Sequence, residues 1–395
     1  MRQISPEEIA EQYRLAVENK VLSSQCKAAI FYSSALLANR LSILSNHFPK
    51  NTLHAVAIKA NSSPEVLKCI VDAGYGLEAA SIEEVKLAMS AGIVAEKIVF
   101  DSPVKTREEI AYCHQHLPGM IVNANALQEL SRYPADFSGR LGLRINPLVQ
   151  TDAPEFFDVV RKNSKFGVPI SLEAEIIEAC LQYSKVSGLH IHIGSGIKDF
   201  SGNVAAVKLV CALAEKINNR RVALGIETKI SWIDIGGGIH FDSEAGSFGV
   251  QSFVKALKKE TPLFESFEVI TEYGAFVHKH NSFAISRIEY VLASAHPEIA
   301  DTAFIHLGAD LFLRKVYSSL PIEYPCFVLQ KSPALETSTY NIAGPLCFAG
   351  DYLYYDLALP KLAEGDLFVI QDIGANTLSM WSGHCSRERP KVVLY

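Results

Sequence analysis

A lysine that follows a short apolar run is the first residue in this sequence whose type and position could do chemistry. His54 to Ile58 has strand character, Lys59 comes directly after it, and Ser62-Ser63-Pro64 begins a helical pattern. A lysine at the end of such a strand faces the mouth of its sheet, where partial desolvation would lower its pKa and make the amine a nucleophile. Taken alone, Lys59 is better explained as an ordinary solvent-facing lysine, so other strands must supply the rest of a site.

Polar residues or glycines end most of the other strand-like runs as well, and in a parallel barrel these ends lie on one face. Taken singly, each has an ordinary structural explanation; a histidine in an apolar run, for example, fits a hydrogen-bonded core residue. Taken together, they place acidic, basic and imidazole groups beside the lysine. The residues are Glu78, Arg144, His192, Ser195, Glu272 and Gly274.

A glycine triplet adds a possible phosphate site. Gly236, Gly237 and Gly238 follow the run that ends near Asp234, and their backbone N–H groups could converge on a phosphate together with the hydroxyl of Ser195. A nucleophilic lysine, a phosphate site, an aromatic stacking partner and a carboxylate together suit pyridoxal 5′-phosphate (PLP). In PLP the aldehyde reacts with the lysine, and the ring, kept protonated by the carboxylate, accepts electrons from a carbanion. The sequence therefore predicts PLP as the cofactor.

The strands that would position these residues recur along the chain, with helical patterns between most of them. The first four begin about 22 residues apart, which is typical of compact βα units. Eight such strands predict an α/β fold, a (β/α)8 TIM barrel; an open doubly wound sheet is the alternative. The predicted strands are 54–58, 76–80, 98–101, 120–123, 140–145, 187–193, 231–235 and 268–272.

After Val277 the pattern changes to strand-like runs separated by turns, which predicts a C-terminal antiparallel β domain. We expect a PLP-binding barrel over residues 28–277 and a β-sandwich or barrel-like domain over residues 278–395, with residues 1–27 packing on the latter. A helix should begin at Ser5-Pro6-Glu7-Glu8, which has capping-box spacing. The C-terminal runs are Ser282–Val291, Pro325–Leu329, Leu367–Ile370 and Val392–Leu394.

The composition narrows the classes of function. The chain has 395 residues, of which 49% are hydrophobic and 20% charged, and its net charge of −6 favours neither nucleic acid nor an anionic membrane as a partner. No apolar run is long enough to span a bilayer, and no signal peptide is visible. The eight cysteines are scattered without a CxxC pair, which argues against a metal site or a disulfide framework. We expect a cytoplasmic protein.

Motifs along nearly the whole chain resemble, in the same order, those of the alanine-racemase-fold (fold type III) PLP-dependent decarboxylases. Diaminopimelate and ornithine decarboxylases belong to this family. The resemblance implies a PLP-binding barrel and the decarboxylation of an amino acid. The motifs are Ala57-Ile-Lys-Ala-Asn61, Arg144-Ile-Asn-Pro147, Ser164-Lys-Phe-Gly167, Gly188-Leu-His-Ile-His-Ile-Gly-Ser-Gly196, Asp234-Ile-Gly-Gly-Gly238, Glu272-Tyr-Gly-Ala275, Gly344-Pro-Leu-Cys-Phe-Ala-Gly-Asp351 and Gly374-Ala-Asn-Thr-Leu-Ser-Met380.

The resemblance also implies roles for single residues. Lys59 would form the Schiff base with PLP, His192 would stack on the ring, and Glu272 would pair with the pyridine nitrogen. Cys347 would return a proton to the substrate after CO2 leaves. In the family this cysteine comes from the neighbouring subunit, which implies a homodimer with shared sites; taken singly, a cysteine here also fits a small core residue. Further cofactor contacts would be Glu78, Arg144, Ser195, Gly236, Gly237, Gly238, Gly274 and Asn376.

The sequence departs from the diaminopimelate branch of the family where the substrate would lie. Ala275 replaces an arginine, Phe348 replaces the acidic residue that holds the far ammonium group, and Asn376 replaces a tyrosine that touches cofactor and substrate. Each lost charge-assisted bond costs roughly 1.5–3 kcal/mol. We therefore expect the same cofactor chemistry on a different substrate.

Several alternatives remain open at this point. Arg314 or Lys315, before Tyr317, could bind a substrate carboxylate, and the pocket would suit a far end that is apolar, acidic or attached to a larger scaffold, as in secondary-metabolite or siderophore-precursor assembly. The chain could also be a diaminopimelate decarboxylase itself. A racemase on the same fold would remove the Cα proton instead of CO2, and a relative without catalysis would regulate a partner.

Overall fold

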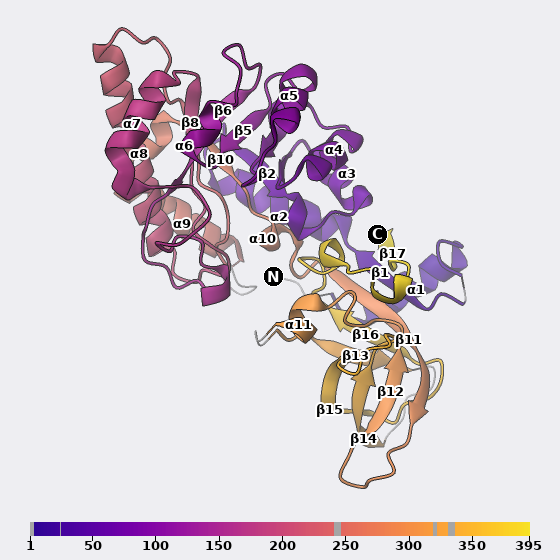
Figure 1. Ribbon diagram of the computed structural model, residues 1–395. Helices are drawn as coiled ribbons and strands as arrows, with labels where there is room; N and C mark the ends of the chain where they lie inside the picture. Colours follow the sequence, from indigo (N-terminus) through magenta and orange to yellow (C-terminus); the bar gives the residue numbers. More distant parts are fainter. Residues whose placement is uncertain (1–3, 24, 241–245, 319–321, 331–335) are drawn as a thin grey trace. The chain divides into compact units, whose positions relative to one another are not determined.

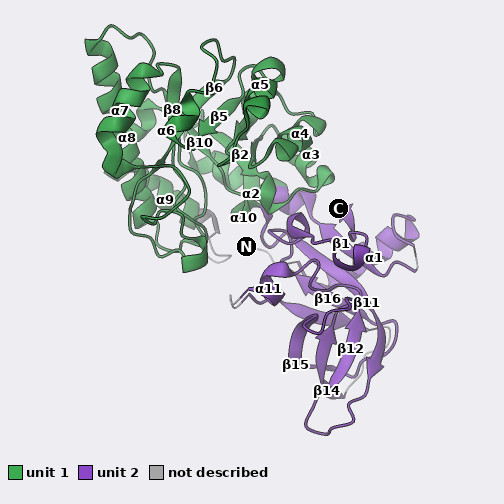
Figure 2. Ribbon diagram, viewed as in Figure 1, with its two compact units in different colours: residues 1, 38–277 green, residues 2–37, 278–395 purple. Residues whose placement is uncertain are grey.

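The computed structural model describes residues 4–23, 25–240, 246–318, 322–330 and 336–395. The chain forms two compact units (Figures 1 and 2). Unit 1 contains Ala38–Val277, and unit 2 contains the described residues before Ala38 together with His278–Tyr395. Residues 1–3 and 24, part of the segment expected to pack on the C-terminal domain, lie outside the described residues.

Unit 1 is a barrel of parallel strands. In the described part of the chain, eight strands close the ring, and each predicted run overlaps one of them, which confirms the predicted (β/α)8 barrel. The barrel strands are β2 (Leu53–Ala57), β3 (Gly76–Ala79), β4 (Ile98–Phe100), β5 (Ile121–Ala124), β6 (Arg140–Asn146), β8 (Val186–His190), β9 (Trp232–Asp234) and β10 (Glu268–Thr271). They pair in the order β5-β4-β3-β2-β10-β9-β8-β6, with β5 beside β6, and β7 (Val168–Pro169) pairs with β6 outside the ring.

Helices accompany the barrel strands, and two of them begin at side-chain caps. Thr106 and Glu109 form a complete capping box, and the hydroxyl of Ser81 accepts a hydrogen bond from the backbone N–H of Glu84. The helices are α2 (Ser34–His47), α3 (Pro64–Asp72), α4 (Ile82–Ser90), α5 (Arg107–His116), α6 (Leu127–Leu130), α7 (Glu173–Gln182), α8 (Ser201–Ala223), α9 (Gly246–Glu260) and α10 (Ala275–His278). Short 3-10 turns are η1 (Ile58–Ala60), η2 (Ala95–Lys97), η3 (Glu155–Phe157), η4 (Ile170–Leu172) and η5 (Pro262–Ser266).

An apolar layer around Trp232 fills the barrel interior toward the amino ends of the strands. The indole ring is fully buried, and glycines on two strands make room for it. A Cβ on Gly188 would lie 2.0 Å from the Trp232 ring, and a Cβ on Gly142 would lie 2.4 Å from it. Any larger residue there would displace the indole. The layer consists of Ala55, Val99, Ile121, Trp232 and Ile270.

Unit 2 is a mixed β domain. Most neighbouring strands run antiparallel as predicted, whereas the pairs β1–β17 and β12–β14 are parallel. The strands are β1 (Ala28–Tyr32), β11 (Ser282–Leu292), β12 (Asp301–Ile305), β13 (Cys326–Leu329), β14 (Thr337–Ala343), β15 (Tyr352–Pro360), β16 (Leu367–Gln371) and β17 (Lys391–Leu394). The helices are α1 (Pro6–Glu18) and α11 (Leu313–Tyr317), with η6 (Leu378–Met380) and η7 (His384–Ser386) near the C-terminus. Strand β1, inside the range 28–277, belongs to this unit because it pairs with β11 and β17.

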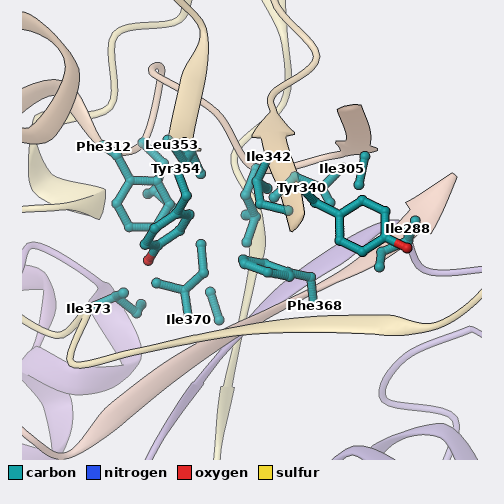
Figure 3. Packing of buried hydrophobic residues seen from close by; sticks show 14 of the residues in the cluster. Ile288, Ile305, Phe312, Tyr340, Ile342, Leu353, Tyr354, Phe368, Ile370 and Ile373 are labelled. Atoms are coloured by element: carbon teal, nitrogen blue, oxygen red, sulfur yellow. The ribbon is translucent and has the colours of Figure 1, made fainter. Parts of the chain in front are cut away.

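Aromatic and branched aliphatic side chains form the core of unit 2 (Figure 3). Phe312, which directly precedes α11, packs edge-on against Tyr324 with ring centroids 5.1 Å apart, so α11 is anchored at its first turn. Tyr354 on β15 lies against Phe368 on β16. Among the described residues, none of the helices is both long and apolar enough to cross a membrane.

Candidate active site

Beyond the Trp232 layer, toward the carboxyl ends of the strands, the barrel interior is polar. Successive side chains of a strand alternate between its two faces, so the residue two positions after an inward-facing one also points inward. On four strands, an apolar core residue is followed two positions later by a buried polar residue. The pairs are Val99 and Asp101, Ile121 and Asn123, Trp232 and Asp234, and Ile270 and Glu272. Strand pairing places Arg144 and His190 in register with Asp234.

Lys59 lies in the turn η1 that follows β2. Its Nζ is 2.6 Å from Oε2 of Glu78 on β3; half of the Lys59 side chain is exposed, whereas Glu78 is buried. Burial acts to lower the pKa of Lys59, but the charges of Glu78 and Glu272 outweigh it and raise this pKa above its usual value. The expected lowering of the Lys59 pKa is therefore wrong for this structure, because carboxylates from other strands compensate the desolvation.

Glu272, which follows β10, belongs to a buried acidic cluster. One carboxylate oxygen from each of Asp101, Asp234 and Glu272 and one ring nitrogen of His190 all lie within 4.8 Å of one another. His190 Nε2 is 3.5 Å from Oδ2 of Asp101 and 3.7 Å from Oε2 of Glu272. Burial, followed by the charge of Glu78, raises the pKa of Glu272.

The two aspartates of this acidic cluster are shifted in the same direction. Burial, followed by the charge of Glu272, raises the pKa of Asp101 to about 6 and that of Asp234 well above its usual value. Oε1 of Glu272 has no hydrogen-bond partner in the described part of the chain. This oxygen can accept a hydrogen bond from a protonated carboxyl of the cluster or from an N–H group of a bound molecule.

His192 is held as a neutral ring. The backbone N–H of Gly237 donates to its Nδ1 at 3.2 Å, so that the ring proton must be on Nε2. Burial, together with the positive charges of Arg144 and Lys59, lowers the pKa of His192 well below its usual value. Its Nδ1 is also 3.8 Å from Oε2 of Glu272. A neutral imidazole fixed in this way offers a flat face beside the carboxylate.

The glycine triplet lies against the loop that carries Ser195. Gly236 and Gly238 have φ values of +64° and +91°, which side chains rarely adopt. A Cβ on Gly238 would lie 1.7 Å from the carbonyl oxygen of Gly194 and 3.4 Å from Cα of Ser195. The structure thus brings the predicted phosphate residues together, although the N–H of Gly237 already donates to His192.

Arg144 is a buried cation in the same layer of the barrel. Its guanidinium carbon lies 4.4 Å from the centre of the Phe166 ring. Burial lowers the pKa of Arg144, and the charges of Asp101 and Glu272 oppose this shift. Arg144 therefore stabilises the ionised form of the nearby acids.

Gly274 allows the end of β10 to approach the turn that carries Lys59. A Cβ on Gly274 would lie 2.8 Å from Cβ of Ala60 and 3.0 Å from Cβ of Ala57. Ala275 follows at the start of α10 and is exposed. The predicted residues of unit 1 are thus collected at the carboxyl ends of the barrel strands.

The remaining predicted residues belong to unit 2. Cys347 and Phe348 are exposed in the loop between β14 and β15. Asp351 fixes this loop, because its Oδ2 accepts a hydrogen bond from the N–H of Leu346 at 2.7 Å and its Oδ1 accepts one from the N–H of Ala309 at 2.6 Å. The loop therefore presents the thiol and the phenyl ring from a rigid base.

Tyr317 on α11 stacks on Phe348, with ring centroids 5.3 Å apart and an interplanar angle of 16°. Lys315 is already committed within unit 2: its Nζ is 2.8 Å from Oε2 of Glu323 and donates to the carbonyl oxygen of Ile322. Burial lowers the pKa of Arg314.

Asn376 adopts the left-handed region with a φ of +57°. Asparagine tolerates this conformation better than most residues, because its short polar side chain can hydrogen-bond locally. The residue is partly buried in the segment between β16 and η6.

Four residues of the polar layer, Asp101, Asn123, His190 and Asp234, were not predicted as site residues. Asp101 and His190 could have been found from the sequence. Asp101 is the polar residue that ends a strand-like run, and His190 lies two positions before His192 on the same strand face. His190 has no hydrogen-bond partner on either ring nitrogen within the described residues, and burial lowers its pKa to about 3.

The fold and these residues define a class of protein. A barrel whose mouth holds a half-exposed lysine, a buried glutamate with an unsatisfied oxygen, a neutral histidine and a glycine triplet has the groups that PLP requires: an amine, a partner for the ring nitrogen, a stacking face and a phosphate site. Residues 35–279 match the family described as "Pyridoxal-dependent decarboxylase, pyridoxal binding domain", and residues 284–374 match its "C-terminal sheet domain". The chain belongs to this family of fold type III PLP-dependent amino-acid decarboxylases.

Individual relatives agree with this assignment. The chain is 29% identical to a diaminopimelate decarboxylase of Archaeoglobus fulgidus over 377 residues, covering 92% of this chain and 86% of the relative. It superposes on the diaminopimelate decarboxylase of Helicobacter pylori, solved with L-lysine, with a TM-score of 0.81 and 24% identity over 96% of this chain and 94% of that one. The lysine/ornithine decarboxylase of Vibrio vulnificus, solved with putrescine, gives a TM-score of 0.80 at 20% identity over 99% of both chains. At these identities the structural likeness concerns the fold.

Proposed function

We propose that this protein is an α-decarboxylase for an amino acid whose far end is not an ammonium group. One observation supports the catalytic part above all: Lys59, His192 and Glu272 come from three separate strand ends and converge on one barrel mouth. The substrate part rests on Phe348, which stacks on Tyr317 beside the exposed Cys347.

PLP, when bound, supplies an aldehyde for amines and an electron-accepting ring. In the proposal Lys59 is the amine that holds the aldehyde, and Glu78 keeps this amine in position. Glu272 would accept a hydrogen bond from the protonated ring nitrogen, and Arg144 stabilises the charge of the glutamate. His192 would stack on the ring, while Ser195 and the triplet Gly236–Gly238 would hold the phosphate.

Cys347 is the proposed acid that delivers a proton from Sγ to Cα of the product. Its exposed position on a loop braced by Asp351 suits a group that acts outside its own unit. We propose a homodimer in which each Cys347 completes the site of the partner subunit, as the family resemblance implies.

The far end of the substrate would meet an aromatic surface. Phe348 and Tyr317 stack and remain partly exposed, which suits an apolar or planar group, or an amino acid attached to a larger scaffold. Arg314 and Lys315 are both candidates for binding a substrate carboxylate, and Lys315 is paired with Glu323 in this structure.

Borohydride reduction tests the role of Lys59. The protein mixed with PLP should show an absorbance band near the visible edge that borohydride removes, and peptide mass spectrometry should then find the pyridoxyl group on Lys59. Lys59→Ala should form no such band. A Lys59→Ala variant that still forms it would refute the assignment.

A mass-spectrometric screen for CO2 loss tests the substrate. The screen covers diamino acids, amino diacids and carrier-linked amino acids, with Phe348→Asp and the apolar control Phe348→Leu. We expect Phe348→Asp to raise kcat/KM for a substrate with a far ammonium group by on the order of tenfold to 150-fold relative to wild type, the equivalent of a charge-assisted hydrogen bond. Wild-type preference for diaminopimelate would instead make the chain a diaminopimelate decarboxylase.

A racemase on the same fold is the second candidate. It would remove the Cα proton and keep the carboxylate, and Cys347 in its Gly-Pro-x-Cys motif counts against it. Deuterium exchange at Cα without CO2 release would favour this alternative.

A further inference from the structure

Asp101 is a buried carboxyl for which the proposed function leaves no role. Its Oδ1 accepts a hydrogen bond from Nδ2 of Asn123 at 2.7 Å, which fixes the side chain in one orientation. Its Oδ2 lies 3.5 Å from Nε2 of His190, and it is within 4.8 Å of a carboxylate oxygen of Glu272. Asp101 is therefore held close to the carboxylate that the proposed function places at the ring nitrogen.

Asp101 and the buried carboxyls of Glu78, Asp234 and Glu272 outnumber the cations Lys59 and Arg144 beside them. Lys105, the cation nearest in sequence, is 3.0 Å from Glu129 and is neutralised by it. Burial lowers the pKa values of His190, on β8, and His192, in the following loop, so both histidines are uncharged. Excess negative charge in a buried site is unfavourable, so a carboxyl of this group should retain a proton. The charged and titratable groups around Asp101 are Lys59, Glu78, Lys105, Arg144, His190, His192, Asp234 and Glu272.

We propose that Asp101 and Glu272 share one proton, and that Asp101 is a positioning residue that sets the charge of Glu272. This inference rests on the proposed function, in which Glu272 faces the ring nitrogen of PLP. When Asp101 is protonated it donates to Glu272, whose unsatisfied oxygen then has a partner. When the proton leaves, two carboxylates face each other. Such a pair titrates as one unit, and burial with the charge of Glu272 raises the pKa of Asp101 to about 6.

The stability of the PLP-free protein provides a test that does not depend on activity. The pKa of Asp101 rises from 3.8 to about 6 on folding, so the folded state binds the proton more tightly than the unfolded state does. Stability is therefore lost as pH rises from about 4 to about 6. Asp101→Asn removes this loss while keeping the hydrogen bond with Asn123. The unfolding temperature of Asp101→Asn minus that of wild type should increase by about 2–6 °C between pH 4.5 and pH 7. A difference that stays constant would overturn the inference.

PLP affinity over the same pH range gives a second readout. In wild type the dissociation constant should change about threefold to tenfold between pH 5 and pH 7 as the shared proton is lost, and in Asp101→Asn this change should disappear. Asp310→Asn is the matched control, because it also neutralises a buried aspartate, which pairs with Arg387 in unit 2. This control should keep the wild-type pH dependence of PLP binding. An unchanged pH dependence in Asp101→Asn would overturn the inference.

Should Asp101→Asn fail to fold, infrared spectra of the wild type labelled with carboxyl-¹³C aspartate replace it. Part of the protonated-aspartate band should vanish with a midpoint near pH 6; the absence of any such loss would overturn the inference. Failure of the wild-type protein to bind PLP at all would overturn the proposed function instead. The stability and infrared measurements would still test whether Asp101 and Glu272 share a proton.

Discussion

At the scale of single residues, the pKa of Lys59 depends on a neighbour from another strand, Glu78. The two side chains form an ion pair across adjacent strands, and the lysine has a raised pKa although burial opposes this. In Glu78→Gln the Lys59 amine should therefore be less basic. We expect its rate of reaction with an amine-modifying reagent at pH 9, in the PLP-free protein, to rise about threefold to tenfold, as measured by peptide mass spectrometry.

Asp72→Asn is the control for Glu78→Gln. It removes the carboxylate that is 2.8 Å from Lys68 in an ion pair exposed on α3. Solvent screens exposed pairs, so the reactivity of Lys68 should change little. If the reaction rate of Lys59 in Glu78→Gln and that of Lys68 in Asp72→Asn rise by the same factor, the buried carboxylate of Glu78 has no special effect.

Residue types at the site could be predicted from the sequence, whereas their protonation states could not. Lys59, His192 and Glu272 stand at strand ends that the apolar pattern reveals. The direction of the Lys59 pKa shift depends on Glu78 and on distances between strands, which no local pattern contains. Asp101 could have been found, because it lies two positions beyond the inward-facing Val99.

At the scale of the elements, the loops after the barrel strands require glycine at particular positions. Gly238 has a φ of +91°, and a Cβ there would collide with the backbone of Gly194 at 1.7 Å. Gly238→Ala should therefore destabilise the protein by about 2–4 kcal/mol in urea unfolding and reduce PLP affinity.

Gly92→Ala is the matched control for Gly238→Ala. Gly92 also has a positive φ, of +85°, but nothing lies within 4 Å of a Cβ placed there. This substitution should cost only about 1 kcal/mol and leave PLP affinity unchanged. Similar losses in both variants would show that backbone conformation alone, and not the approach to Gly194, explains the requirement at residue 238.

The barrel strands were predictable because each is a short buried apolar run followed by a polar or glycine-containing turn. The parallel pairs of unit 2 were not, because β1 and β17 come from opposite ends of the chain and no periodicity links them. The contact between Tyr317 and Phe348 was equally hidden, since it joins α11 to a loop about thirty residues later.

At the scale of the whole molecule, the proposed shared site makes a distinct prediction. Lys59→Ala and Cys347→Ala should each have little activity alone. If every site combines Lys59 of one subunit with Cys347 of the partner subunit, a mixture of both variants that is allowed to exchange subunits should recover about a quarter of wild-type activity. The measurement is CO2 release before and after exchange, and no recovery after verified exchange would contradict sites shared between subunits.

The indole of Trp232, lodged between Gly142 and Gly188, seals the barrel beneath its reactive mouth. Changes on the two sides of this seal should have separate consequences. Substitutions at the amino ends of the barrel strands should change mainly the thermal stability of the fold. Substitutions at the carboxyl ends, beyond Trp232, should change mainly the substrate specificity. Laboratory evolution could therefore improve durability below the indole and diversify substrate range above it, each with little penalty to the other.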